Sequence, residues 1–147
     1  MRGAAVGAVG AVVPDPAVDG DVVVLVVPAA NTYLAVLRTA TAGLAARLTM
    51  TLDQIEDLRI AVDEACAILV PLATASRPDA AGPEVTCRFT VMPEALRIDV
   101  SVWTPYGHKL PGAQSFSWQV LTALAGEVAA DARDGRATIS LTKRRSG

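Results

Sequence analysis

The stretch Thr51 to Pro71, TLDQIEDLRIAVDEACAILVP, decides the fold. Thr51 followed three residues later by Gln54 is typical of a capping box, in which each side chain binds a backbone N–H at a helix start. Pro71 is expected to end this helix because it has no N–H to donate. In between, apolar residues recur every three or four positions and predict a single core-facing stripe. The stripe consists of Ile55, Leu58, Val62, Ala65, Cys66 and Leu69.

Glu64 points away from this stripe, and Ile60 and Ile68 lie one helical turn before and after it. Isoleucines on that side indicate a second apolar face, with Glu64 in a cleft. Burial there would raise the pKa of the Glu64 carboxyl and suit it to general-base chemistry. The alternative is an exposed acid beside two surface isoleucines, and the pattern leaves both interpretations open.

The composition limits the classes of protein to which the chain can belong. The 147 residues fit one domain, and 52% hydrophobic with only 4% aromatic residues predict an aliphatic core. Thirteen basic and fifteen acidic residues give a net charge of −2, which argues against a general nucleic-acid binder or a binder of anionic membranes. The basic cluster Lys143 to Arg145 is interpreted as a solubilising tail rather than a binding patch.

The cysteine and histidine content argues against a disulfide framework and a structural metal site. Cys66 falls in the predicted helix and Cys87 in a strand-like run, and there is one histidine and no Cys-x-x-Cys pair. Two separated thiols of this kind are expected to be inert core residues rather than a redox switch. The sequence therefore predicts a reduced, cytoplasmic protein without a bound metal.

The first 20 residues are rich in Ala, Gly and Val and differ from the rest of the chain. One Arg before an apolar run is a feature of signal peptides, but this run is broken by glycine and too short to span a bilayer. We expect residues 1–20 to be a disordered leader and residues 21–145 to form the domain.

The segment before the central helix predicts a strand and a further helix. Residues 21–27, DVVVLVV, form a β-branched run typical of a covered strand. Asn31 or Thr32 is expected to cap the following helix, whose apolar side includes Tyr33 and Leu34. Arg38 falls at the edge of that side, where it either extends to water over its neighbours or meets a carboxylate on a partner.

The segment after the central helix predicts a hairpin, a helix and a closing strand. The strand pattern covers 84–91 and 95–103 with a turn at 92–94, and a Pro- and Gly-rich loop follows over 104–114. Ser115 is expected to cap a helix that runs to about Val128, and the remaining predictions are an edge strand or turn at 131–135 and a strand at 137–142. This order predicts an α/β fold: a two-layer α/β sandwich with helices on one face of a mixed, mostly antiparallel sheet.

Two parts of the chain carry a family resemblance. The run PAANTYLAVLRTATAGLAARLTMTLDQIEDLRIAVDEACAIL resembles the amino-terminal half of RsbW-type anti-sigma factors, which belong to the GHKL superfamily with the Bergerat ATP-binding fold. The likeness is greatest from Ile55 to Cys66. The segment from Ser115 to Arg144 is similar to actinobacterial members of the same group, so the resemblance covers most of residues 22–144.

The resemblance implies a function in transcription control. Members of the family sequester a sigma factor, and many use ATP to phosphorylate a serine on a STAS-type antagonist that otherwise displaces the sigma factor. Glu64 matches the family's general base. Arg38 matches an arginine on the first helix that contacts both partners, and with Tyr33 and Leu34 it forms the implied partner-binding set. The resemblance also implies a homodimer.

The nucleotide-binding motifs of the family are altered here. Ile68 stands where the family has an Asn that ligates Mg²⁺, and an apolar side chain offers no oxygen ligand. The family also has an Asp that accepts a hydrogen bond from the adenine amino group. No Asp lies between Asp99 and Asp131 here, and Val102 or Trp103 stands near the expected place. Only Gly112 remains of the glycine-rich segment before the last helix, where Ser115 at the helix start would be a weak anion site.

Two hypotheses follow. In the first, the chain is an anti-sigma factor that binds a sigma factor and is released by a STAS-domain antagonist. It would have no Mg²⁺ and weak or lost ATP binding, any remaining affinity coming from apolar contacts with adenine. In the second, it is an active serine kinase that uses other residues, such as Asp63 for metal and the 104–114 loop as a lid. Phosphoryl transfer depends on metal and positioning, so Glu64 alone favours the first hypothesis.

Overall fold

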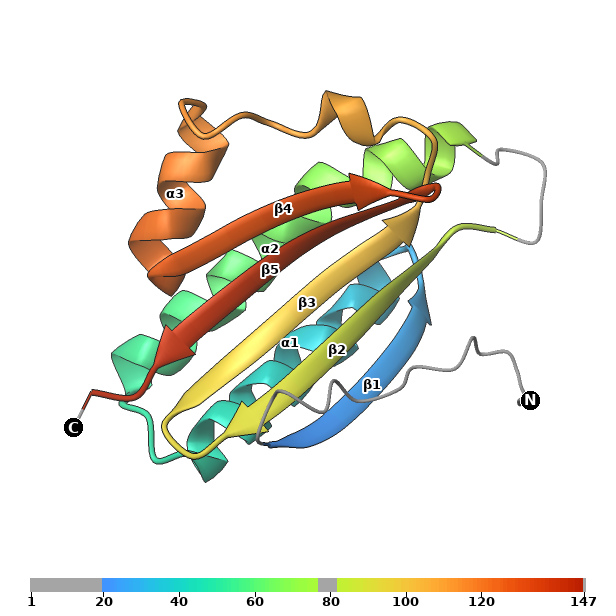
Figure 1. The fold of residues 1–147 in the computed structure, drawn as a ribbon. Helices are drawn as coiled ribbons and strands as arrows, with labels where there is room; N and C mark the ends of the chain where they lie inside the picture. Colours follow the sequence, from blue (N-terminus) through green and yellow to red (C-terminus); the bar gives the residue numbers. More distant parts are fainter. Residues whose placement is uncertain (1–19, 77–81, 147) are drawn as a thin grey trace.

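The computed structural model describes residues 20–76 and 82–146 (Figure 1). Apart from Gly20, the leader predicted over residues 1–20 lies outside this part. The elements, in chain order, are β1 (Asp21–Pro28), α1 (Asn31–Arg47), α2 (Leu52–Ser76), β2 (Glu84–Met92), β3 (Ala95–Trp103), the 3-10 turn η1 (Gly107–Lys109), α3 (Phe116–Ala125), β4 (Glu127–Arg133) and β5 (Arg136–Arg144). None of the helices in the described ranges is both long and apolar enough to cross a membrane.

The described strands form one sheet in the order β1-β2-β3-β5-β4. Each neighbouring pair is antiparallel, so the sheet is wholly antiparallel rather than mixed. Figure 1 shows α1, α2 and α3 on one face of this sheet and the strands in front of them. The two-layer α/β sandwich expected from the sequence is confirmed.

Side-chain alternation gives the sheet two chemically different faces, as the hairpin pattern predicts. On β2, Val85, Cys87 and Phe89 are fully buried beneath the helices. Their register partners across the sheet continue this apolar layer, for example Phe89 opposite Ile98 and Ile98 opposite Leu141. The opposite face, called the outer face below, carries the intervening residues of each strand.

The start of α2 is the capping box that its sequence predicts. The Thr51 N–H donates to Gln54 Oε1 over 3.0 Å, and the Gln54 N–H donates to Thr51 Oγ1 over 3.1 Å. From there the predicted stripe enters the core, where Leu58 and Leu69 are fully buried. The helix therefore starts where expected and presents the expected face to the sheet.

The prediction that Pro71 ends this helix is wrong, since α2 continues through Pro71 to Ser76. Contacts beyond the proline hold the last turn. Ala73 is 2% exposed, the carbonyl of Leu72 accepts a hydrogen bond from Thr104 Oγ1 at 3.0 Å, and Thr74 Oγ1 donates to the carbonyls of Val70 and Pro71. Tertiary packing here outweighs the one N–H that proline removes.

Two further helix boundaries differ from expectation. The N-cap of α1 is Ala30 and has no side-chain hydrogen bond, because Asn31 and Thr32 already lie within the first turn. Ser115 does cap α3, accepting the Trp118 N–H at 3.2 Å, but the helix ends at Ala125 rather than about Val128. Gly126, with a φ of +93°, turns the chain out of the helix and into β4.

We expect Thr51→Ala to lower the free energy of unfolding by about 1 kcal/mol, because it removes the oxygen that accepts the Gln54 N–H. Urea denaturation followed by circular dichroism measures this change. Thr39→Ala is the matched control, since Thr39 lies exposed within α1 and its hydroxyl bonds only the Ala35 carbonyl. Equal losses in both variants would contradict a capping role for Thr51.

Candidate functional site

A groove between α1 and α2 brings together several residues singled out from the sequence. Arg38 Nη1 of α1 lies 2.8 Å from Asp63 Oδ1 of α2, so an ion pair joins the two helices. The groove has a volume of about 370 Å³ and a mostly apolar wall beside this pair. Its lining consists of Asn31, Leu34, Arg38, Asp63, Cys66, Ala67, Val70 and Pro71.

Arg38 therefore meets a carboxylate of its own chain, which neither sequence interpretation named as its partner. The side chains of Arg38 and Asp63 are 32% and 49% exposed, so solvent reaches both ends of the ion pair. An ion pair this exposed contributes roughly 0–1 kcal/mol to stability. Its main effect is to hold the guanidinium in one place at the rim of the groove.

The other two residues of the implied partner-binding set differ in accessibility. Tyr33 is 49% exposed on α1, whereas Leu34 is only 9% exposed and belongs to the hydrophobic core. A partner at this surface would touch Arg38 and Tyr33 directly. Leu34 lines the groove with the small part of its side chain that stays exposed, and the rest of it packs in the core beneath the helix.

No sequence pattern indicates that Asp63 pairs with Arg38. The two residues are 25 positions apart, and only the packing of α1 on α2 brings them together. From the sequence, Asp63 is a candidate only as an alternative metal ligand. Its side chain is instead engaged by a guanidinium.

Cys66 lies at the inner wall of the groove and is 2% exposed. Burial is the main cause that raises the pKa of its thiol to about 12, and the nearby negative charge of Asp63 acts in the same direction. Burial likewise raises the pKa of the Cys87 thiol. Both thiols are free and stay protonated at neutral pH, which agrees with inert core residues rather than nucleophiles.

The other side of α2 carries Glu64 and Ile68 towards the carboxyl-terminal elements. They share a helical stripe with Asp57, whose Oδ2 lies 3.7 Å from Lys143 Nζ of β5, and with Leu72, whose carbonyl accepts the Thr104 hydroxyl. Lys143 also donates to the Leu124 carbonyl of α3 at 2.8 Å. Glu64 and Ile68 therefore lie on the side of α2 that faces α3 and the loop after β3.

The environment of Glu64 is intermediate between the two sequence interpretations. Glu64 and Ile68 are each half-buried, while Ile60 is 44% exposed. Within residues 20–76 and 82–146, Glu64 forms no ion pair. The carboxylate is thus partly shielded from water but is not neutralised by a basic side chain.

Ile68 and the start of α3 both weaken the fit to Mg²⁺ and to the phosphates of a nucleotide. Ile68 offers hydrocarbon where a metal ligand is needed, and the described ranges hold no cluster of three or more His, Cys, Asp or Glu side chains suited to a metal ion. At the start of α3, the Ser115 N–H is bound to the Gly112 carbonyl and the Trp118 N–H to the Ser115 hydroxyl. These two N–H groups are already used within the chain.

The adenine and glycine positions also differ from a nucleotide cradle. Val102 is fully buried towards the helices, and Trp103 points to the outer face, where it is 50% exposed. Gly112 has open space where a Cβ would stand, so no close approach of another group requires glycine at this position. No carboxylate stands at either of the positions expected to read adenine.

The raised pKa of the Cys66 thiol predicts how the stability of the protein changes with pH. Above pH 9 an unfolded chain loses the Cys66 proton while the folded chain keeps it up to about pH 12, so the thiol lowers stability as the pH rises. We expect the difference in unfolding free energy between the native chain and Cys66→Ala to shrink by about 2 kcal/mol between about pH 8 and 10.5. Urea denaturation at both pH values measures it, and a constant difference would contradict the raised pKa.

Comparisons with known proteins bear on this arrangement. No protein-family model matches the chain. Serine-protein kinase RsbW of Bacillus subtilis (strain 168) is 39% identical over 83 residues, covering 56% of this chain and 50% of that protein. Anti-sigma-F factor RsbW of Mycobacterium tuberculosis (strain H37Rv) is 35% identical over 96 residues, which cover 65% of this chain and 52% of that protein. The chain thus spans about half the length of the curated relatives it matches. The resemblance found in the sequence is confirmed, and the chain is a relative of the RsbW-type proteins.

Proposed function

We propose that the chain is an anti-sigma factor that binds a sigma factor through α1 and the α1–α2 groove. A STAS-domain antagonist would release it by competing for the same surface, without phosphoryl transfer. The name anti-sigma-F factor belongs to the relative from Mycobacterium tuberculosis, and its similarity to this chain supports the proposal. The name serine-protein kinase belongs to the Bacillus relatives.

The observation that carries this proposal is the Arg38–Asp63 pair at the rim of an apolar groove. A positioned guanidinium recognises a carboxylate through two parallel hydrogen bonds. The apolar walls beside it, including Cys66 and Val70, suit the hydrophobic side chains of a partner helix. Tyr33 adds an exposed aromatic ring on the same helix, and such rings are common contact residues in protein interfaces.

The same proposal predicts weak or absent ATP binding. Phosphoryl transfer needs metal ions and tight positioning of the phosphates, and a base cannot replace them. Ile68 and the occupied N–H groups at the start of α3 oppose both requirements.

The second candidate function is an active serine kinase, favoured by the position of Glu64. A half-buried carboxylate without an ion pair in the described part, facing the loop after β3, is where a general base would be expected. This alternative would require metal ligands other than residue 68. Asp63, the substitute considered from the sequence, is already paired with Arg38.

A homodimer is part of the proposal. Among the described strands β1 lies at an edge of the sheet, and its Val23 and Val26 are 37% and 45% exposed. An exposed apolar edge strand is usually covered by another chain or protected by charges. Light scattering of the purified chain measures the oligomeric state.

We expect Arg38→Ala to weaken sigma-factor binding by roughly 2 kcal/mol, about thirtyfold in Kd, because the partner carboxylate loses its guanidinium. Each sigma factor and each STAS-domain protein encoded in the same genome is purified and titrated against the chain by calorimetry. Asp63→Asn is the matched control, since it removes the intrachain ion pair but keeps Arg38. An unchanged affinity for Arg38→Ala, or no binding to any of these proteins, would overturn the proposal.

We expect no phosphate transfer when the chain, Mg²⁺ and radiolabelled ATP are incubated with the STAS-domain protein that binds it. The reason is that the residues at the metal and phosphate positions do not fit these groups. Phosphoprotein formation is followed by autoradiography after gel electrophoresis. Incorporation that disappears in Glu64→Ala would establish the kinase alternative instead.

A further inference from the structure

The outer face of the sheet holds a wide hollow that the proposed function does not use. It has a volume of about 610 Å³ and lies over β2, β3, β5 and β4, on the opposite side of the sheet from the helices. Arginine and hydroxyl side chains dominate its lining. The lining consists of Thr86, Arg88, Arg97, Asp99, Ser101, Ala129, Ala130, Asp131, Arg133, Arg136, Thr138 and Ser140.

A row of hydroxyl groups crosses the floor of this hollow. Thr86, Ser101 and Thr138 are aligned in register on β2, β3 and β5. Ser101 is only 8% exposed, and none of the three hydroxyls has a hydrogen-bond partner within the described ranges. Thr86 and Thr138 are half-buried, so their hydroxyls can reach a ligand that enters the hollow and donate to it.

Of the two carboxylates in the lining, Asp131 is engaged at both oxygens and Asp99 at Oδ1, whereas Asp99 Oδ2 is buried without a hydrogen-bond partner in the described ranges. Asp99 Oδ1 accepts hydrogen bonds from Arg97 Nε and from the Ser140 hydroxyl. Asp131 is held by Arg133 through two contacts of 2.8 and 3.3 Å. Arg97 and Arg133 are each paired with one of these aspartates, and Arg136 adds a further positive charge to the lining.

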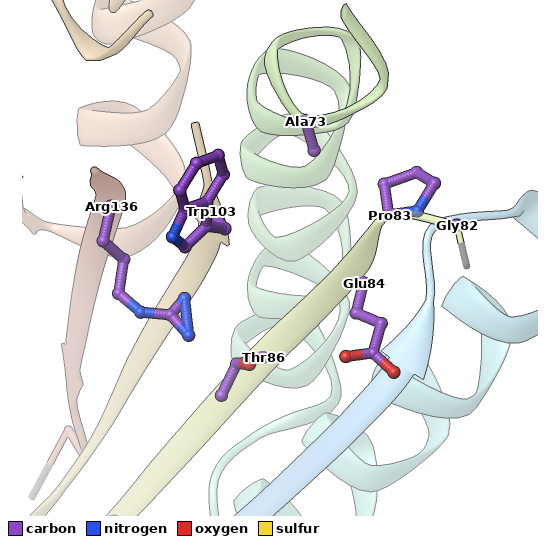
Figure 2. Close-up of a pocket in the computed structure, with 7 residues that line it drawn as sticks. All are labelled: Ala73, Gly82, Pro83, Glu84, Thr86, Trp103 and Arg136. Carbon is purple, nitrogen blue, oxygen red and sulfur yellow. The ribbon is translucent and has the colours of Figure 1, made fainter. Parts of the chain in front are cut away.

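Arg136 has the most suitable position to meet an anion. It forms no ion pair with any residue of the described ranges, and it stands directly opposite Arg133 in the β4–β5 register. Arg133 is already paired with Asp131, so its guanidinium contributes less to an anion site than that of Arg136 does. Figure 2 shows the Arg136 side chain reaching from β5 towards Thr86 of β2 beside Trp103, in a smaller hollow of about 80 Å³ that shares Thr86 and Arg136 with the larger one.

We propose that this outer-face hollow binds an oxyanion of the phosphate class. Arg136 would meet the anion from the β5 side, and the hydroxyls of Thr86, Ser101 and Thr138 would donate to its oxygens. Guanidinium and hydroxyl donors are the groups that recognise phosphate oxygens. This site is separate from the α1–α2 groove and from the Glu64 side of α2, because the sheet lies between them.

Calorimetric titration of the full chain with inorganic pyrophosphate tests the proposal. We expect one site, with affinity reduced about tenfold in Arg136→Ala and about fivefold in Thr138→Val. Arg136 is exposed and Thr138→Val keeps the shape of the side chain, so both variants should fold. Circular dichroism of each variant checks the fold before titration.

Two control variants separate this site from other origins of binding. Arg47→Ala removes an exposed arginine of α1, and Ser115→Ala alters the start of α3, so both should keep the native affinity. Loss of affinity in Ser115→Ala but not in Arg136→Ala would place the anion at the helix and overturn the proposal. Equal loss in Arg47→Ala, no measurable binding, or a changed oligomeric state of Arg136→Ala without an effect on binding would overturn it as well.

Discussion

The packing of α2 against the sheet is the constraint on which the rest of the structure depends. One side of this helix is fully buried against β3 and β5, where Leu58 and Leu69 meet the apolar layer of Ile98 and Leu141. Small side chains within the same stripe, such as Ala65, let the helix approach the strands closely. This contact fixes the rotation of α2, and therefore which residues face α1 on one flank and α3 on the other.

Sequence patterns predicted the parts of the fold that depend on local chemistry. The Thr51–Gln54 capping box, the Ser115 cap and the β2–β3 hairpin involve neighbouring residues and were found correctly. The passage of α2 through Pro71 depends on distant contacts and was missed. Of β4, the first two residues were expected in the preceding helix and residues 131–133 in an edge strand or turn, because this exposed edge strand is rich in alanine and lacks a clear alternation.

In the candidate sites, too, sequence patterns predict what depends on neighbouring residues and miss what depends on distant contacts. Glu64 and Ile68 could be placed on one side of a helix from their spacing, and the structure puts that side against the carboxyl-terminal elements. The partner of Arg38 could not be predicted, because Asp63 is 25 residues away and no local pattern links them. The outer-face arginines lie on four strands and meet only through the register of the sheet, so their proximity was equally hidden from the sequence.

The Arg38–Asp63 pair has a physical consequence for any acidic partner. An exposed ion pair contributes roughly 0–1 kcal/mol, whereas a guanidinium desolvated against a carboxylate in an interface commonly contributes more. A partner carboxylate can therefore replace Asp63 at a small cost in free energy. The Arg38 side chain is already held at the groove, so binding does not have to order it. Asp63 would also repel a second acidic group at the same place. The ion pair thus favours a partner with a single carboxylate beside apolar side chains over one that is merely acidic.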